Sequence, residues 1–112
     1  MKVKQGVVRE GLRPEMLFAL GFIEAVYRLH GPREPTLTSG LDGTHSPNSL
    51  HYSGRAVDIR TRTLSRQTAQ EIVKVLRATL DPLGFDTVLE ENHVHCEFDP
   101  KGEERVFTEG VA

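Results

Sequence analysis

Three histidines and one aspartate in this 112-residue chain are spaced so that they could hold a metal ion. His51 precedes Asp58 by seven positions, and His93 and His95 lie on either side of a single valine. Two imidazoles and one carboxylate are the ligand set of a zinc ion whose fourth position stays open for water. Because an open position favours chemistry over scaffolding, the spacing predicts a zinc hydrolase.

Such ligands need a rigid support, and the surrounding sequence predicts strands. Side chains two apart on a strand point to the same face, so His93 and His95 can converge on one site. Residues 54–60 alternate weakly and favour a neighbouring strand that carries Asp58, with Gly54 allowing a bend or a close approach beside it. Taken alone, the H-x-H pattern is a weak signal, because a histidine is more often a surface or hydrogen-bonded residue.

The rest of the chain predicts two helices and four short strands. One helix is expected over residues 14–29, and a second follows Ser65, whose side chain can cap it. Strands are expected over residues 35–40, 54–60, 85–90 and 93–98. The predicted fold class is a small α+β domain, in which two helices pack against an antiparallel sheet that carries the histidines. Residues 1–112 are expected to form a single domain.

Composition and charge exclude several functional classes. A net charge of -2 and the lack of a basic stripe argue against nucleic-acid binding. The single cysteine, Cys96, excludes an internal disulfide and a cysteine-based zinc finger. Residues 1–16 contain no apolar run, so neither a signal peptide nor a membrane span is expected. We therefore expect a protein made in soluble form in the cytoplasm, and a monomer.

Two motifs resemble those of a known group of proteins. Residues 49–58, Ser-Leu-His-Tyr-Ser-Gly-Arg-Ala-Val-Asp, are similar to the S-x-H-x-x-G-x-A-x-D signature of the zinc D-alanyl-D-alanine metallopeptidases. These share a fold group with the lysostaphin-type enzymes and the hedgehog signalling domain. Residues 84–95 resemble the closing H-x-H hairpin of that group, and residues 97–100, Glu-Phe-Asp-Pro, resemble the end of this hairpin in phage and prophage cell-wall peptidases. The resemblance covers residues 38–100.

The resemblance implies a role for each histidine of the motifs. It assigns zinc to His51, Asp58 and His95. It places His93 beside the metal, where it would help to bind the transition state or move a proton. His45 matches a histidine that precedes the first ligand in hedgehog-type sequences, which would bring it near the metal.

The resemblance also implies an activity, the hydrolysis of amide bonds in the peptide part of bacterial peptidoglycan, as in a phage or prophage endolysin. Zinc would activate water for the attack. Glu90 matches the general base of the phage-type hairpin and is the preferred assignment, whereas a gapless overlay on the hedgehog segment selects Glu91 as its rival. A protein of this kind would reach the cell wall only after release from the cytoplasm.

The bond that such an enzyme would cut depends on the residues after the Ser-Gly turn. Related enzymes that trim a free D-alanine often carry an arginine after the Ser-Gly turn, but here Leu41 and Asp42 occupy that place. This favours an endopeptidase over a carboxypeptidase, unless Arg33, Arg55 or Arg62 binds the substrate carboxylate.

The alternative function is a non-enzymatic, zinc-containing binding module, or a virion structural module, of hedgehog-like fold.

Overall fold

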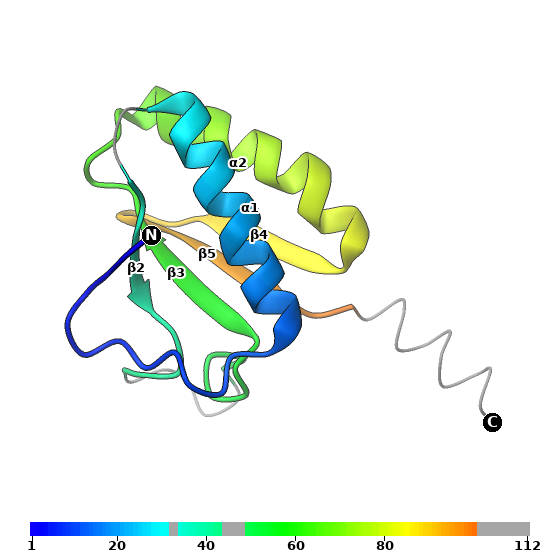
Figure 1. Cartoon of the computed structure of the whole chain (residues 1–112). Coiled ribbons are helices and arrows are strands. Elements are labelled where there is room, and N and C mark those ends of the chain that lie inside the picture. The colour runs from blue at the N-terminus through cyan, green and yellow to red at the C-terminus, as the bar shows by residue number, and fades with distance from the viewer. Residues whose placement is uncertain (32–33, 44–48, 101–112) are drawn as a thin grey trace.

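The computed structural model describes residues 1–31, 34–43 and 49–100, which form two α-helices and a five-stranded sheet (Figure 1). In chain order the elements are β1 (Lys2–Val3), α1 (Pro14–His30), β2 (Thr36–Ser39), β3 (Ala56–Arg60), α2 (Arg66–Leu80), a 3-10 helix (Asp81–Leu83), β4 (Phe85–Leu89) and β5 (His93–Phe98). The strand order is β1-β2-β3-β5-β4, so the strands that carry Asp58 and the H-x-H pair are neighbours.

The predicted α+β class is confirmed, with two main helices packed against a small sheet. The sheet is mixed because β1 pairs with β2 in parallel, whereas all the other pairs are antiparallel. The two residues of β1 are too few to show the alternation from which a strand is predicted. Within the parallel pair, β1 lies at the edge of the sheet, whereas β2 pairs with β3, the strand that carries Asp58.

The ends of the helices follow from local sequence. Pro14 is the first residue of α1, where its missing N–H group has no helical partner to lose. Ser65 caps α2 as predicted, because its side-chain oxygen accepts a hydrogen bond from the backbone N–H of Thr68 at 3.1 Å. Gly84 ends the 3-10 helix with a φ of 102°, a left-handed conformation that favours glycine.

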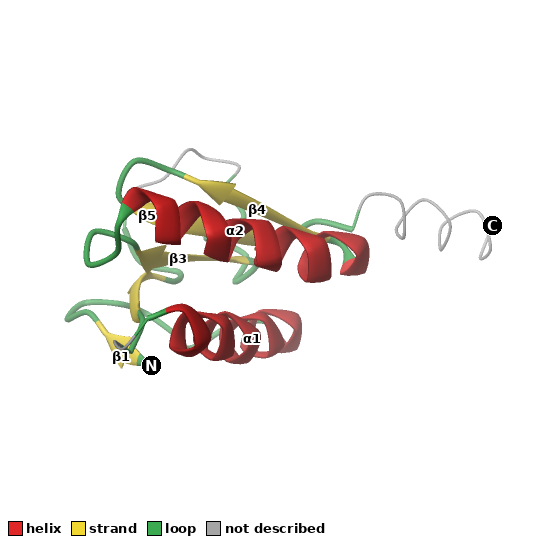
Figure 2. Cartoon of the chain, turned by 90° about the horizontal axis from the view of Figure 1, so that it is seen from above, coloured by secondary structure: helices red, strands yellow, loops and turns green. Residues whose placement is uncertain are grey.

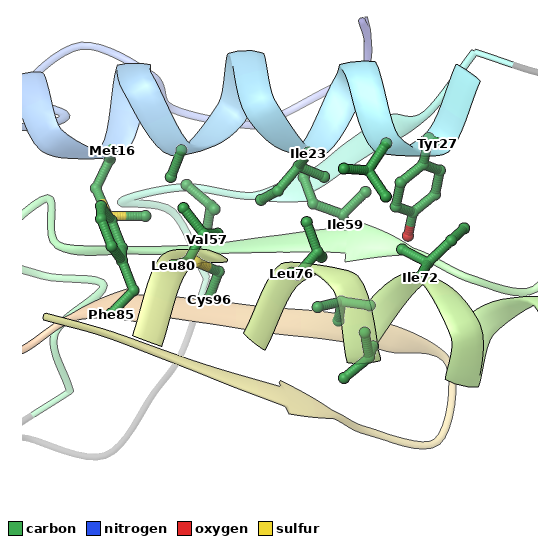
Figure 3. Packing of buried hydrophobic residues seen from close by; sticks show 14 of the residues in the cluster. Met16, Ile23, Tyr27, Val57, Ile59, Ile72, Leu76, Leu80, Phe85 and Cys96 are labelled. Atoms are coloured by element: carbon green, nitrogen blue, oxygen red, sulfur yellow. The ribbon is translucent and has the colours of Figure 1, made fainter. Parts of the chain in front are cut away.

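Both helices cover one face of the sheet, and they run side by side (Figures 1 and 2). Figure 3 shows the core, which lies between the two helices on one side and strands β3 and β5 on the other. The side chains that are fully buried there include Ile23, Val57, Ile59, Ile72, Leu76, Leu80, Val94 and Cys96. Among the described residues, neither helix is both long and apolar enough to cross a membrane. The opposite face of β3 and β5 is left for the polar residues of the motifs.

Candidate metal centre

The predicted ligands meet on the face of the sheet that the helices leave uncovered. His51, Asp58 and His95 each offer one ligand atom, and these atoms all lie within 4.8 Å of one another. Asp58 is directly opposite His95 across β3 and β5. Its Oδ1 lies 2.9 Å from Nδ1 of His95 and 3.5 Å from Nε2 of His51. The sheet register therefore sets two of the ligands, and the loop before β3 adds the third.

The other ring nitrogen of each histidine ligand is held by an acceptor. Nδ1 of His51 donates a hydrogen bond to the carbonyl of Gly40 at 2.7 Å, and Nε2 of His95 donates to the carboxylate of Glu97 at 2.9 Å. Metal-binding histidines are usually fixed in this way, since the acceptor selects the tautomer and aims the free nitrogen at the ion. The residues present thus fit a metal ion bound through Nε2 of His51, Nδ1 of His95 and a carboxylate oxygen of Asp58.

His93 lies beside this group, with its Nε2 atom 3.6 Å from Oδ1 of Asp58. Its Nδ1 donates to the side-chain oxygen of Asn92 at 2.7 Å, so Nε2 faces the centre. The side chain of His93 is 28% exposed, whereas that of His51 is 3% exposed. His93 can therefore reach a molecule that approaches from solvent, which the buried His51 cannot.

The loop that carries His51 is shaped by two glycines in contact with the N-terminal segment. Gly54 has a φ of 72°, and a Cβ atom there would lie 2.1 Å from the carbonyl oxygen of Gly11. A Cβ at Gly40 would lie 2.3 Å from the carbonyl oxygen of Val8. The hydroxyl of Ser49 accepts a hydrogen bond from the N–H of His51 at 3.2 Å, as expected of a residue that orders this loop. Gly54 thus makes a close approach to Gly11, whereas the sequence led us to expect a bend or close approach between His51 and the strand of Asp58.

The carboxylate and the imidazoles shift one another's pKa values. Burial alone would raise the pKa of Asp58, but hydrogen bonds and charges from the surrounding histidines outweigh it and hold the pKa well below its usual range. The hydrogen bond to Asp58, followed by a smaller one to Glu97, raises the pKa of His95 to about 9 against the effect of burial. In the metal-free protein a proton on His95 therefore compensates the charge of Asp58, and a metal ion would have to displace it.

The two candidate bases line a different cleft from the one beside the ligands. Glu90 and Glu91 are both exposed, and they share their cleft with Leu64 and Ala69, near the first turns of α2. Neither glutamate lines the cleft beside Asp58. Glu90 is nevertheless bonded to His93 across the hairpin, because its N–H donates to the His93 carbonyl at 2.8 Å. The catalytic roles assigned to Glu90 and His93 stay predictions.

Several other expectations concern residues near the motifs. Cys96 is fully buried in the core, on the face opposite to His95, so it is not a fourth ligand. Burial raises the pKa of its thiol to about 12. His45 and Arg33 lie outside the described residues.

Reasoning from the sequence did not identify the three acceptors that orient the histidines, namely Gly40, Asn92 and Glu97. Glu97 carried a usable signal, because it stands two residues after His95 on the same strand and so shares its face. Asn92 directly precedes His93 in the tight turn. The carbonyl of Gly40 had no sequence signal, since any residue carries one.

A comparison of the sequence with known families matches residues 37–97 to the hedgehog amino-terminal signalling domain. This match covers a little over half of the chain. The chain belongs to that family. Among curated relatives, it is 44% identical over 57 residues to the Indian hedgehog B protein of Danio rerio, and 42% identical over 57 residues to the Indian hedgehog protein of Gallus gallus. Each alignment covers 49% of this chain but only 13% of the relative.

Membership of a signalling family corrects several expectations. The prediction of a phage endolysin that hydrolyses peptidoglycan is wrong, and so is peptidoglycan as the partner, because the family and the relatives are hedgehog signalling proteins. The expected cytoplasmic location is wrong for the same reason. The physical cause is that both motifs specify the geometry of a metal site on a sheet. Peptidases and signalling domains of this fold group share that geometry, so the motifs cannot separate their functions.

Proposed function

We propose that this domain is a zinc-containing recognition module that binds a protein partner and does not hydrolyse it. The zinc ion would be held by His51, Asp58 and His95. The observation that carries the proposal is the second hydrogen bond of each histidine ligand, to Gly40 or to Glu97, which leaves one ring nitrogen directed at Asp58.

Zinc suits this donor set because imidazole nitrogens and a carboxylate oxygen are common zinc ligands. His51 and Asp58 have side chains that are only 3% and 12% exposed, so the pair is costly to bury without a cation between or beside them. Metal binding energy is coupled to folding, and zinc would therefore stabilise the loop that brings His51 to the sheet.

Recognition is favoured over hydrolysis by the position of the candidate bases. A general base must come within hydrogen-bond reach of the proton that it removes. Glu90 and Glu91 line a cleft beside α2 that adjoins the cleft of Asp58 and His93 at Arg62, and neither glutamate lines the cleft of Asp58. Membership of a signalling-domain family supports the same conclusion, since a signal acts by binding other proteins.

Hydrolysis of an amide bond in a protein substrate is a second candidate, supported by the three-residue ligand set and by His93. Three protein ligands leave one position of a zinc ion open, and bound zinc would supply Lewis acidity there. His93 has an Nε2 atom that faces the same space, 3.6 Å from Asp58, and could donate a hydrogen bond to a developing oxyanion.

The metal assignment is tested by the zinc content of the purified protein, measured by elemental mass spectrometry. The wild-type chain is expected to hold about one zinc ion. His51→Ala should lose most of it, whereas His30→Ala should keep it, because His30 lies at the end of α1, where it bonds to the carbonyl of Val26. Full occupancy in His51→Ala would contradict the assignment.

The two candidate functions are separated by a turnover assay with the zinc-loaded protein and a mixed library of unstructured peptides. The recognition module should cleave no more than a chelator-treated sample does. Hydrolysis that is lost in Glu90→Gln or Glu91→Gln, with zinc retained, would establish the peptidase instead and would identify its base.

A further inference from the structure

A polar cleft of about 240 Å³ opens beside the candidate metal centre, and three cationic side chains line it. Asp58 and His93 belong both to this cleft and to the metal centre. The other lining residues are Lys4, Thr38, Ser39, Arg60, Arg62 and Asn92. The cleft thus gathers cationic, hydroxyl and amide groups around a space that can take one or two side chains.

The cations come from segments that only the folded sheet brings together. Lys4 directly follows β1, and its N–H donates to the carbonyl of Leu37 in β2 at 2.9 Å. Arg60 is the last residue of β3 and is paired with His93 on β5. Arg62 lies two residues further along the chain. Because paired residues of neighbouring strands share a face, Arg60 lies on the face of the sheet that carries the metal centre.

No carboxylate partner is recorded for Lys4, Arg60 or Arg62 among residues 1–31, 34–43 and 49–100. Two arginines elsewhere do have such partners, since Arg28 pairs with Glu24 and Arg13 pairs with Glu15. The chain as a whole has a net charge of -2. Three cations therefore gather at one cleft, where Asp58, a candidate metal ligand, is the carboxylate among the lining residues.

Asp42, which stands near the place where related enzymes often carry an arginine, is bonded to backbone groups outside the cleft. Oδ1 of Asp42 accepts hydrogen bonds from the backbone N–H groups of Val8, at 2.8 Å, and Gly40, at 2.9 Å. Asp42 does not line the cleft. Its carboxylate ties the N-terminal segment to the loop after β2.

We propose that this cleft binds the carboxylate of an acidic side chain in a partner peptide, through Lys4, Arg60 and Arg62. The inference rests on the proposed function and names the chemistry of the partner that the module recognises. A guanidinium group presents paired N–H donors that match the two oxygens of a carboxylate, and two arginines with one lysine can hold one or two such groups. The volume fits side chains and is too small for a folded segment.

The test uses the full chain loaded with zinc and two peptides blocked at both ends, tetra-aspartate and tetra-asparagine. Binding is followed by nitrogen-15 NMR at low salt. Tetra-aspartate should bind about tenfold more tightly than tetra-asparagine and shift the signals of Asn92 and His93, an advantage that added salt should screen.

Two double variants with the same loss of charge locate the effect. R60Q/R62Q should weaken tetra-aspartate binding about tenfold, on the scale of a lost charge-assisted contact, and keep zinc. R9Q/K74Q removes two exposed cations that do not line the cleft, and it should leave the affinity unchanged.

Equal affinities for the two peptides, or equal losses in the two double variants, would overturn the inference. Tighter binding of inorganic phosphate or of a sulfated oligosaccharide at Asn92 and His93 would overturn the assignment to a carboxylate. The zinc content of the same wild-type sample is measured before the peptide is added. Lack of zinc there would contradict the proposed function, whereas full zinc with no preference for tetra-aspartate would contradict only this inference.

Discussion

The central strands β3 and β5 present two faces with opposite properties. On the face toward the helices, Val57, Ile59, Val94 and Cys96 are all fully buried and form the core. On the other face, Asp58 and His95 alternate with these residues and form the candidate metal centre. A shift of one residue in register would exchange the two faces, so the core that fixes the register also assembles the metal ligands. Stability and metal binding should therefore respond to different substitutions on the same strand.

The largest expected effect comes from the inner face of β3. Ile59→Ala removes buried methylene and methyl groups from a side chain with no exposed surface, and it should lower the free energy of unfolding by about 3 to 4 kcal/mol. Denaturant titration measures this change. Ile59→Val should cost only about 1 kcal/mol. The loss should be the same with and without zinc, and a loss seen only with zinc would show that the two faces are not independent.

The next prediction concerns the loop that carries His51 and contacts the N-terminal segment. Gly54→Ala should lower the free energy of unfolding by about 2 to 3 kcal/mol, because it combines an unfavourable positive φ with a collision at the carbonyl of Gly11. Gly6→Ala is the matched control. Gly6 has a φ of 89° but no neighbour within 4 Å of its added Cβ, so only about 1 kcal/mol is expected.

The same two glycine variants should also differ in their affinity for zinc. Gly54 lies three residues after His51, so a displaced backbone should weaken zinc binding in Gly54→Ala. Gly6→Ala should leave zinc affinity unchanged. Equal stability losses in the two variants would mean that the segment around Gly11 yields to the new side chain.

The fold was largely predictable because its elements have strong local signals. The helical pattern of residues 14–29, the Ser65 cap of α2 and the tight turn between β4 and β5 each predict an element that the structure contains. The short strand β1 was not predictable, because its pairing with β2 depends on a contact across about 34 residues. Its role in placing Lys4 beside the cleft has no local signature either.

The candidate ligands were predictable for a different reason, since spacing on strands already places side chains on a common face. The hydrogen bond of His51 to Gly40 was not, because it joins a side chain to a backbone carbonyl eleven residues away. The function could not be predicted from the two motifs either. They describe how a metal ion could be held, whereas Arg60 and Arg62, which we propose to contact the partner, lie outside both motifs.

Glu97 and Glu90 offer a smaller and more specific test, which asks what holds the metal ligands in place. Glu97→Gln replaces the carboxylate that accepts the hydrogen bond from Nε2 of His95, and it should weaken zinc binding about ten- to a hundredfold. Glu90→Gln makes the same chemical change outside the cleft beside Asp58, and it should leave zinc affinity unchanged. Competition with a chelating dye measures both. A loss in Glu90→Gln that matches Glu97→Gln would show that Glu90 also supports the ligands.

The smallest expected effect is a dependence of stability on pH in the metal-free protein. It comes from His95 and Asp58, on the face of the sheet that the helices leave uncovered, and not from the buried core. The pKa of His95 is raised from 6.5 to about 9 in the folded, metal-free protein, chiefly by its hydrogen bond to Asp58. Between these two values the folded state binds the proton that the unfolded state has lost. The stability from this pair is therefore fully present below pH 6.5 and is lost as the pH rises through about 9. The lowered pKa of Asp58 acts in a separate window, since its contribution is lost only in acid, below pH 3.8.

Denaturant titration in the presence of a chelator should show a fall of about 1 to 2 kcal/mol in the free energy of unfolding between pH 6.5 and 9.5, after allowance for the partial exposure of His95. His95→Gln cannot take up the proton and should show no such fall in this window. In the zinc-loaded protein the fall should also disappear, because a ligand nitrogen must be unprotonated to hold the metal. Metal-free protein that is equally stable at both pH values would show that Asp58 does not retain the proton on His95, and the histidine would then be neutral and ready for the metal before it arrives.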